Sequence, residues 1–371
     1  MNSNQSRNIY SKIFKVILLI GLVYLFLLSV ELLGESFETL GEGVATAFIE
    51  TVSNPILGLV VGIFSTSIVQ SSSATTSTVV GLVAGGAFGS DPATAIQLAI
   101  PIIMGANIGT SVTNTVVSIG HISRDTEFKR AFSASVVHDF FNVLAVLTIF
   151  PLQYFFNFLG HISHFLANIF QGIGGLKLAD PLGFIIDPVV NYLLSLLSGF
   201  EWTGIAIALI LLFLSLRYIV KTMRSLVLHK LELFFDNYLF KNPARAIGLG
   251  FLFTAILQSS SITTSLAVPL AGAGVLTVEQ IYPYSLGTNI GTTVTTLLAA
   301  MATGNKTCLI IAFAHLSFNL VGILIWLPLK KVPISAAKKF SEITNKYKFF
   351  PFVYILVSFF LIPILLIYFV R

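Results

Sequence analysis

The stretch "NPILGLVVGIFSTSIVQSSSATTS", residues 54–77, decides the fold of this chain. It is apolar for most of its length and then ends in neutral polar residues, "QSSSATTS". A second stretch, "NPARAIGLGFLFTAILQSSSITTS", begins at residue 242, and the offset of 242 − 54 = 188 holds without a gap. Small-residue packing between helices explains repeated Gly and Ala, but not Gln, Ser and Thr kept in order. We therefore interpret the two polar segments as parts of one binding site.

The composition of the chain is that of a membrane protein. Of its 371 residues 55% are hydrophobic and only 10% are charged, whereas soluble domains have about 25% charged residues. The net charge of +5 does not indicate nucleic-acid binding, because Lys and Arg occur in short clusters between apolar segments. The single cysteine, Cys308, excludes an intrachain disulfide. We expect a multi-pass protein of the cell (inner) membrane.

Segments of about 20 mostly apolar residues predict membrane-crossing helices. The predicted crossings are 13–33, 95–118, 129–150, 202–220, 281–300, 308–328 and 351–370. The first is too long for a signal-peptide core and lacks a small-residue cleavage site, so we expect it to be retained. Residues 151–200 predict amphipathic or partly buried external helices.

Shorter apolar pieces flank the two polar segments, at 56–69 and 78–89 and again at 244–257 and 266–276. Each piece is too short to cross a bilayer alone. Each pair, joined by its polar tip, predicts a re-entrant helical hairpin. Such irregular backbone is tolerated at membrane depth where it is buried in protein or lines a wet cavity.

The positions of Lys and Arg predict the orientation. Arg7, Lys12 and Lys15 precede the first crossing, whereas the loop after it, "GESFETLGEGVATAFIE", has no basic residue. The run from Arg217 to Lys230 and the lysines at 330–348 fall on the same side as the N-terminus. By the positive-inside rule this side is cytoplasmic, and seven crossings leave the C-terminus external.

Two further motifs recur in the same order. "GANIGTSVTNT" from Gly105 matches "GTNIGTTVTTL" from Gly287, and "VVHDFFNVL" from Val136 matches "FAHLSFNLV" from Phe313. An odd number of crossings separates the hairpins, so the copies are antiparallel, as in secondary transporters. We predict an all-α polytopic membrane protein with two inverted-topology repeats, each with a re-entrant helical hairpin carrying a QSSS motif. The predicted segments are 1–53 (first crossing), 54–150 (repeat 1), 151–241 (connecting helices and a crossing), 242–328 (repeat 2) and 329–371 (basic linker and last crossing).

The hairpin tips have the chemistry of an anion site. The second half-helix of each hairpin begins around the serines, so its free N–H groups and a dipole charge of roughly +0.5 point at the tip. Ser and Thr hydroxyls add donors, and such groups can hold a buried anion without Arg. Neither tip contains Lys or Arg. Two facing tips of neutral donors suit a small tetrahedral oxyanion.

The same motifs supply oxygen ligands for a hard cation such as sodium. The amide candidates are Asn107, Asn142, Asn289 and Asn319. The hydroxyl candidates, in "NIGT"-type segments where Gly lets carbonyls turn inward, are Thr110, Thr115, Thr288 and Thr292. Helix packing with back-bonding to the preceding turn is the alternative for each threonine.

Asp139 lies in the middle of an apolar span, "SASVVHDFFNVLAVL", where an acidic residue is functional by default. Its counterpart in the second repeat is Leu316, so a sodium site at Asp139 gives the two halves unequal roles. His138 and His315 match each other, and we favour a polar packing role for both over a proton relay.

The motifs "QSSSATTS", "GANIGTSVTNTVVS", "RAFSASVVHDFFN" and "QSSSITTS…GTNIGTT" closely resemble the type II sodium-dependent phosphate cotransporters. The resemblance implies phosphate held by the QSSS hairpins, uptake driven by sodium, and sodium ligands at Thr115, Asn142, Thr288 and Thr292. The position of Asp139 is acidic in the electrogenic members and Gly in the electroneutral one. Three Na⁺ with HPO₄²⁻ carry a net +1, which the membrane potential pulls inward.

Two sets of residues are candidates for phosphate and sodium binding, and the division of Ser and Thr between them stays open. The predicted phosphate-binding residues are Gln70, Ser71, Ser72, Ser73, Gln258, Ser259, Ser260, Ser261, Asn107 and Asn289. The predicted sodium ligands are Asp139, Asn142, Thr115, Thr75, Thr288, Thr292 and Asn319. We expect sodium as the co-transported ion, no organic cofactor, no nucleic-acid partner, and an oligomer that is possible but not required.

The chain departs from the vertebrate members after "TNTVV". There, a Gln and a Gly-Asp pair follow, whereas here His121 replaces the Gln and Arg124 falls where the Asp would be. Asp125 is one place off and is a candidate substitute. The external loop of the vertebrate members is also shortened, as expected for a bacterial relative.

Three alternative functions are considered. A sodium-coupled dicarboxylate or glutamate carrier also uses paired Ser-rich hairpins, but a carboxylate substrate needs an Arg in the core, and none is evident. A serine hydrolase with Ser72 or Ser260 as nucleophile is disfavoured, because the serines are duplicated and G-x-S-x-G is absent. A passive anion channel fits the tips but not the sodium-type segments. We therefore predict a sodium–phosphate symporter and not an enzyme.

Overall fold

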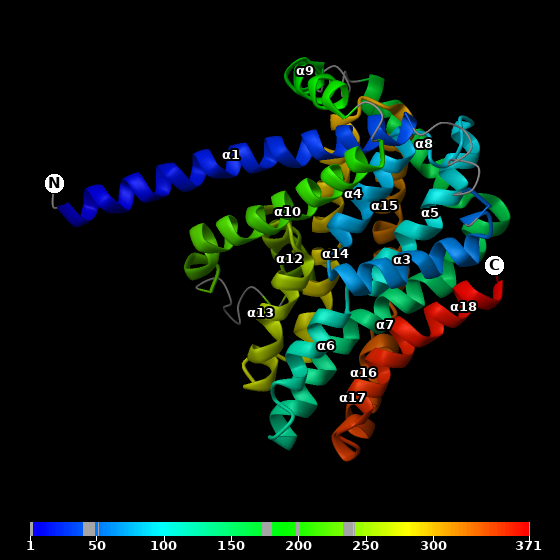
Figure 1. The fold of residues 1–371 in the computed structure, drawn as a ribbon. Helices are drawn as coiled ribbons and strands as arrows, with labels where there is room; N and C mark the ends of the chain where they lie inside the picture. Colours follow the sequence, from blue (N-terminus) through cyan, green and yellow to red (C-terminus); the bar gives the residue numbers. More distant parts are fainter. Residues whose placement is uncertain are drawn as a thin grey trace.

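The computed structural model describes residues 3–39, 49–50, 52–172, 180–197, 201–232, 240 and 242–370. The regular structure of these residues is entirely helical (Figure 1). In the N-terminal half the helices are α1 (Ser3–Glu38), α3 (Pro55–Val69), α4 (Ser72–Ala84), α5 (Pro92–Gly109), α6 (Val112–Ile119), α7 (Asp125–Phe156), α8 (Phe158–Gly172) and α9 (Asp180–Leu196). They continue with α10 (Glu201–Glu232), α12 (Pro243–Leu257), α13 (Ser260–Gly272), α14 (Val278–Ala302), α15 (Lys306–Trp326), α16 (Lys331–Lys346), α17 (Phe350–Leu356), the π-helical η1 (Val357–Leu361) and α18 (Ile362–Val370).

Six helical segments of the described residues are long and apolar enough to cross a membrane, so the chain is a multi-pass membrane protein. They are Ile13–Glu38, Pro92–Ile119, Asp125–Phe156, Trp202–Met223, Lys306–Trp326 and Phe350–Val370. The seventh predicted crossing, 281–300, is covered by α14, which has 25 residues. This helix is less apolar because its five threonines are packed inside the protein.

The two QSSS segments have the same backbone conformation. Gln70 and Gln258 end α3 and α12 in the left-handed region, with φ of 56° and 55°. Ser71 and Ser259 follow in extended conformation and cap the next helix. The prediction that a helix begins at the serines is therefore confirmed in both copies. The expected tip is shorter than predicted, because the residues after each capping serine already belong to α4 or α13.

The first helix of each pair packs mainly along a third helix, α3 along α5 and α12 along α14. Glycines permit this close approach. A Cβ at Gly62 would overlap the carbonyl oxygen of Ile102, and a Cβ at Gly250 would overlap that of Tyr284. The repeat in the sequence is thus a repeat in helix packing. The glycines of the "NIGT" segments serve this packing, which is a different role from the inward-turned carbonyls that we expected.

The two "NIGT" segments differ in structure. In the first, the helix is interrupted between α5 and α6 at Thr110 and Ser111. In the second, α14 runs without a break from Val278 to Ala302. The expected unwinding is therefore present in the first copy and absent from the second.

The remaining helices surround this double unit. Figure 1 shows α1 and α10 side by side, reaching away from the rest of the protein. The amphipathic α16 packs along α7, and the last span contacts α3 through η1 and α18. The helices α8 and α9 occupy the region 151–200, as expected, although α7 continues as far as Phe156.

Candidate substrate and ion site

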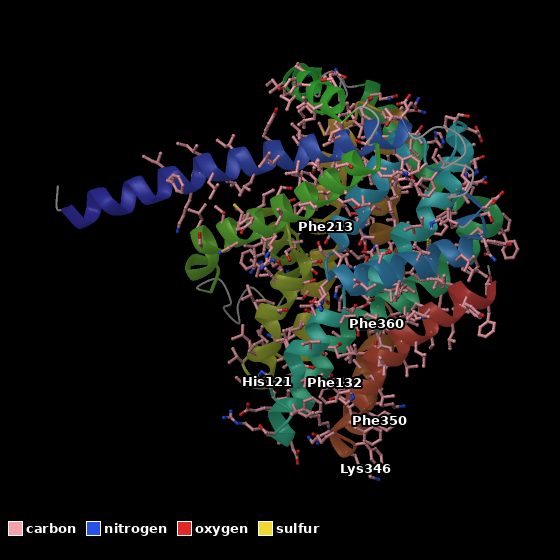
Figure 2. The ribbon with its side chains drawn as sticks, viewed as in Figure 1. His121, Phe132, Phe213, Lys346, Phe350 and Phe360 are labelled. Carbon is pink, nitrogen blue, oxygen red and sulfur yellow. The ribbon has the colours of Figure 1, made fainter. Side chains whose placement is uncertain are left out.

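A cavity of about 440 Å³ lies between the two QSSS segments. Its polar walls include Ser71 from the first copy and Gln258 and Ser259 from the second. The other lining residues are Val69, Ala74, Phe213, Leu216, Arg217 and Val220. Phe213, which is labelled in Figure 2, belongs to α10, so a helix outside both repeats closes the cavity. Two segments 188 residues apart (258 − 70) thus meet at one space of small-ligand size.

The serines of the two segments take distinct positions. Ser71 accepts a hydrogen bond from the amide of Ala74 at 3.2 Å, and Ser259 accepts one from the amide of Ile262 at 3.3 Å. Both capping serines are partly exposed. The serines that follow are buried in the first helical turn: Ser72, Ser73, Ser260 and Ser261. Each tip therefore presents a helix N-terminus, with its positive dipole end, at the cavity.

The two glutamines are not equivalent. Gln258 accepts a hydrogen bond from Thr295 at 2.6 Å and donates one to the carbonyl of Ala255. Gln70 is exposed, and the counterpart of Thr295, Thr113 (295 − 182), has a buried hydroxyl without a hydrogen-bond partner among the described residues. The side chain of Gln258 is thus bonded to its own repeat, whereas that of Gln70 has no such bond among the described residues.

Each second half-helix forms hydrogen bonds to the opposite repeat. Thr76 of α4 lies 2.8 Å from Thr296 of α14, hydroxyl to hydroxyl. At the equivalent place Thr264 of α13 donates to the amide oxygen of Asn114 of α6 at 2.6 Å. The offsets, 264 − 76 = 188 and 296 − 114 = 182, are those of the sequence repeat. The second helix of each QSSS pair therefore contacts the opposite repeat at an equivalent position.

A buried chain of amide groups connects the centres of the two repeats. The Nε2 atom of His138 lies 2.6 Å from the Oδ1 atom of Asn289. Asn289 donates to the side chain of Asn142 at 2.7 Å, and Asn142 donates to the carbonyl of Asn107 at 2.8 Å. Three predicted site residues thus meet. His315 is bonded to Thr296, so both histidines have the polar packing contact that we expected.

Asp139 is buried on α7, next to the amide chain. Its Oδ2 atom accepts a hydrogen bond from the phenol of Tyr354 at 2.9 Å and has a long contact of 3.5 Å with the hydroxyl of Thr115. Its Oδ1 atom is buried and has no hydrogen-bond partner among the described residues. Tyr354 was not predicted as a site residue, because it lies outside both repeats and its separation from Asp139 in the sequence gives no signal.

The other predicted sodium ligands are engaged within their own repeats. Thr288 and Thr292 donate to carbonyls of α14, those of Ser285 and Thr288, as back-bonding threonines do. Thr75 accepts from Thr66 at 3.0 Å and donates to a carbonyl of its own helix. Asn319 donates to the carbonyl of His315, and its Oδ1 atom is buried without a partner among the described residues.

The donor set is suited to an alkali cation and not to a transition metal. Within the described ranges there is no group of three or more His, Cys, Asp or Glu side chains that could hold a metal ion. The region around Asp139 and Asn142 has one carboxylate together with neutral hydroxyl, amide and carbonyl oxygens. Oxygen ligands of this kind are the ones that sodium takes in transporters.

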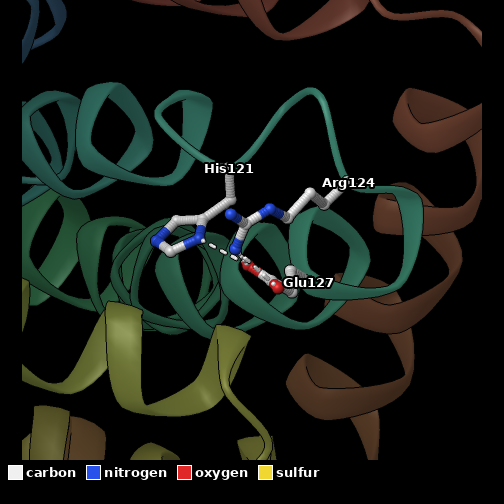
Figure 3. Close-up of polar contacts among 3 residues, drawn as sticks. All are labelled: His121, Arg124 and Glu127. Carbon is white, nitrogen blue, oxygen red and sulfur yellow. Dashed lines mark hydrogen bonds and ion pairs between the residues drawn. The ribbon is translucent and has the colours of Figure 1, made fainter.

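His121 and Arg124 do not join this region. Figure 3 shows both side chains converging on Glu127, with Arg124 at 2.9 Å and His121 at 3.4 Å. Asp125 pairs with Lys348 at 2.8 Å, at the exposed start of α7. It precedes Asp139 by fourteen residues, about 21 Å along a helix. Asp125 therefore does not lie beside Asp139, and its substitution for the missing Asp stays a prediction.

Arg217 lines the cavity together with Ser71 and Ser259, although no Arg in the core was evident from the sequence. Its place in the cytoplasmic basic run stays a prediction. The signal was present, since Arg217 falls inside the predicted crossing 202–220, where a charged residue indicates function.

The serines are not arranged as a hydrolase would require. Neither His138 nor His315 forms a hydrogen bond with Ser72 or Ser260, since the histidines bond Asn289 and Thr296.

The sequence profile of the Na⁺/Pi-cotransporter family matches residues 25–178 and 211–330, and both QSSS segments fall within the match. The chain belongs to the Na⁺/Pi-cotransporter family.

Individual members of the Na⁺/Pi-cotransporter family match nearly the whole chain. Sodium-dependent phosphate transport protein 2B of Pongo abelii is 33% identical over 96% of this chain and 65% of its own length. Protein 2A of Rattus norvegicus is 33% identical over 97% of this chain and 68% of its own length, and protein 2A of Ovis aries is 34% identical over 94% and 66%. The chain thus spans about two thirds of the length of these relatives. No solved structure matches this Na⁺/Pi-cotransporter family member.

Proposed function

We propose that this protein is a secondary active transporter that couples the uptake of inorganic phosphate, as HPO₄²⁻, to sodium. The observation that carries the proposal is the cavity between Ser71 and Ser259, where two helix N-termini from the two repeats meet. Helix N-termini with serine caps bind oxyanions through free N–H groups and a positive dipole end. The names of the relatives, sodium-dependent phosphate transport proteins, agree with this chemistry.

The phosphate ligands in this proposal are the N-terminal turns of α4 and α13, from Ser71 to Ser73 and from Ser259 to Ser261, with Gln70 and Gln258 beside them. The hydroxyls of Ser71 and Ser259 are only weakly held, at 3.2 and 3.3 Å from their capping partners. A phosphate oxygen can therefore exchange for these cap bonds at small cost. Asn107 and Asn289 belong to the amide chain and would hold α5 and α14 in place beside the two tips.

Sodium would bind beside Asp139. A buried carboxylate oxygen without a hydrogen-bond partner is expensive unless a cation or a proton compensates it, and Oδ1 of Asp139 is such an atom. Two candidate ligands are Thr115 of α6, whose hydroxyl is 3.5 Å from Oδ2 of Asp139, and Asn142, which lies three residues after Asp139 on α7. Thr288 and Thr292 only donate hydrogen bonds, so their oxygens keep lone pairs for an ion. The Oδ1 atom of Asn319 has no partner among the described residues, whereas the hydroxyl oxygen of Thr75 already accepts a hydrogen bond from Thr66.

The transport cycle would be alternating access around this fixed site. Such a cycle needs two inverted repeats with re-entrant hairpins, which is the arrangement that we propose here. The protein would lie in the inner membrane with its N-terminus in the cytoplasm. The equivalent contacts, Thr76 to Thr296 and Thr264 to Asn114, fit two halves that move against each other. Three Na⁺ with each HPO₄²⁻ would make transport electrogenic, by about 2.3 kcal/mol per net charge at 100 mV.

A carrier for dicarboxylates or glutamate is the second candidate, because Arg217 supplies the cavity with the cation that a carboxylate substrate needs. Competition in proteoliposomes separates the two. We expect labelled phosphate uptake to require sodium, to be suppressed by arsenate and to be insensitive to succinate. Uptake that persists when choline replaces sodium would overturn the symporter, and suppression by succinate would favour the dicarboxylate carrier.

A further inference from the structure

Arg217 has an unusual position for a cation in this chain. It lies on α10, which belongs to neither repeat, within the apolar span Trp202–Met223. The span continues for six residues after it, about 9 Å of helix. Even so, its side chain lines the cavity with Ser71, Gln258 and Ser259. An Arg at this depth is costly unless it is paired or functional.

Among the residues that the structure describes, Arg217 takes part in no ion pair. Four other cations show the contrast: Arg124, Lys129, Lys338 and Lys348 each bind a carboxylate. One turn along α10, Lys221 lies over the ring of Tyr218 at 5.7 Å and does not line the cavity. No described carboxylate pairs with the guanidinium of Arg217, and the other polar walls of the cavity are neutral.

We propose that Arg217 binds the substrate phosphate in the cavity through its guanidinium. The proposal rests on the phosphate-transport function proposed above and adds a cationic ligand to it. The planar guanidinium offers parallel N–H groups to two oxygens of one phosphate, while the N-termini of α4 and α13 face the remaining oxygens.

The location of Arg217 outside the repeats gives it a separate role from the serines. The two QSSS tips are related by the repeat, so each can hold phosphate in an equivalent way. A single cation on α10 has no such partner, and it therefore makes the two sides of the cavity unequal. The side chain of Arg217 is exposed and not enclosed by protein, so the anion can leave again. A fully buried Arg would instead retain the anion.

The test compares Arg217→Gln, Arg217→Lys and the control Lys221→Gln, which removes an equal charge from the same helix but outside the cavity. Initial rates of labelled phosphate uptake into proteoliposomes give the KM for phosphate, kcat and the sodium concentration at half-maximal rate. For Arg217→Gln we expect the KM for phosphate to rise about 10- to 100-fold, because charge-assisted hydrogen bonds are lost. The sodium concentration at half-maximal rate should not change. Arg217→Lys should restore part of the affinity, and Lys221→Gln should match the wild type.

A KM within about twofold of the wild type for Arg217→Gln would overturn the proposal. An equal rise in Lys221→Gln would also overturn it, since the effect would then be one of general surface charge. If the Gln variant does not accumulate in a folded form, Arg217→Lys is the deciding variant, because Lys keeps the charge but cannot form two parallel hydrogen bonds. An unchanged KM for phosphate in Arg217→Lys would then contradict our inference. The wild-type protein tests the proposed function separately. If it shows no sodium-dependent phosphate uptake, the transport function itself is refuted.

Discussion

The phenol of Tyr354 donates a hydrogen bond of 2.9 Å to the carboxylate of Asp139 and thereby connects the last span of the chain to α7. Asp139 is buried, and its Oδ2 atom also has a contact of 3.5 Å with the hydroxyl of Thr115. The C-terminal span therefore does more than anchor the protein in the membrane. It fixes the orientation of the one carboxylate that we assign to sodium.

Replacing Tyr354 by Phe removes this hydrogen bond and leaves the ring in place. A hydrogen bond to a charged group contributes about 1.5–3 kcal/mol. We expect part of that loss to appear as a rise of about 3- to 10-fold in the sodium concentration at half-maximal uptake, with the KM for phosphate at saturating sodium little changed. The control is Tyr347→Phe, because Tyr347 is exposed. An unaltered sodium dependence in Tyr354→Phe would show that Tyr354 does not position Asp139.

Replacing Asp139 by Gly should separate phosphate uptake from charge movement. The variant removes one negative charge from the region of the proposed sodium ligands, so we expect one fewer sodium ion per cycle and electroneutral transport. The measurement is labelled phosphate uptake together with current across the same proteoliposome membrane, with and without sodium. Persistent phosphate-dependent current in the variant, at wild-type size per phosphate moved, would falsify this assignment of Asp139.

Glycines 248 and 250 on α12 form a matched pair for testing the close packing of α12 against α14. A Cβ at Gly250 would overlap the carbonyl oxygen of Tyr284, whereas a Cβ at Gly248 has no atom within 4 Å. Gly250→Ala should lower thermal stability in detergent, since overpacking costs about 1–3 kcal/mol. Gly248→Ala should leave stability equal or slightly higher, because Ala favours helix. Equal melting temperatures in the two variants would contradict the close approach.

Thr76 and Thr296 should be energetically coupled, since their hydroxyls lie 2.8 Å apart in the buried interior. A double-mutant cycle with Thr76→Val and Thr296→Val should give a coupling of about 0.5–1.5 kcal/mol in reversible unfolding or thermal-shift measurements. Thr264→Val with Asn114→Ala should give a coupling of the same sign, because the contact is the repeat equivalent. Additive effects in both cycles would mean that the half-helices are not held by these contacts.

Several features could be predicted from the sequence because they depend on local physics. The helix start at Ser71 and Ser259 follows from a serine's ability to cap free N–H groups. The number of long apolar helices follows from the composition, and six of the seven predicted crossings meet the requirement for a span. The duplication can be found by comparing the sequence with itself. Asp139 could be predicted as functional because burying a carboxylate in an apolar span is costly.

Other features depend on which helices meet, and no local pattern carries that information. The contact from Tyr354 to Asp139 spans 215 residues, and Arg217 reaches the cavity only because α10 packs beside the two tips. The asymmetry between Gln70 and Gln258 arises in nearly identical segments, so their surroundings decide it. The sequence by itself determined a duplicated, all-helical membrane protein with two serine-capped helix starts, since capping and hydrophobicity act within a few residues. Only the tertiary structure decided which distant side chains complete the site, because these contacts form only when helices far apart in the chain pack together.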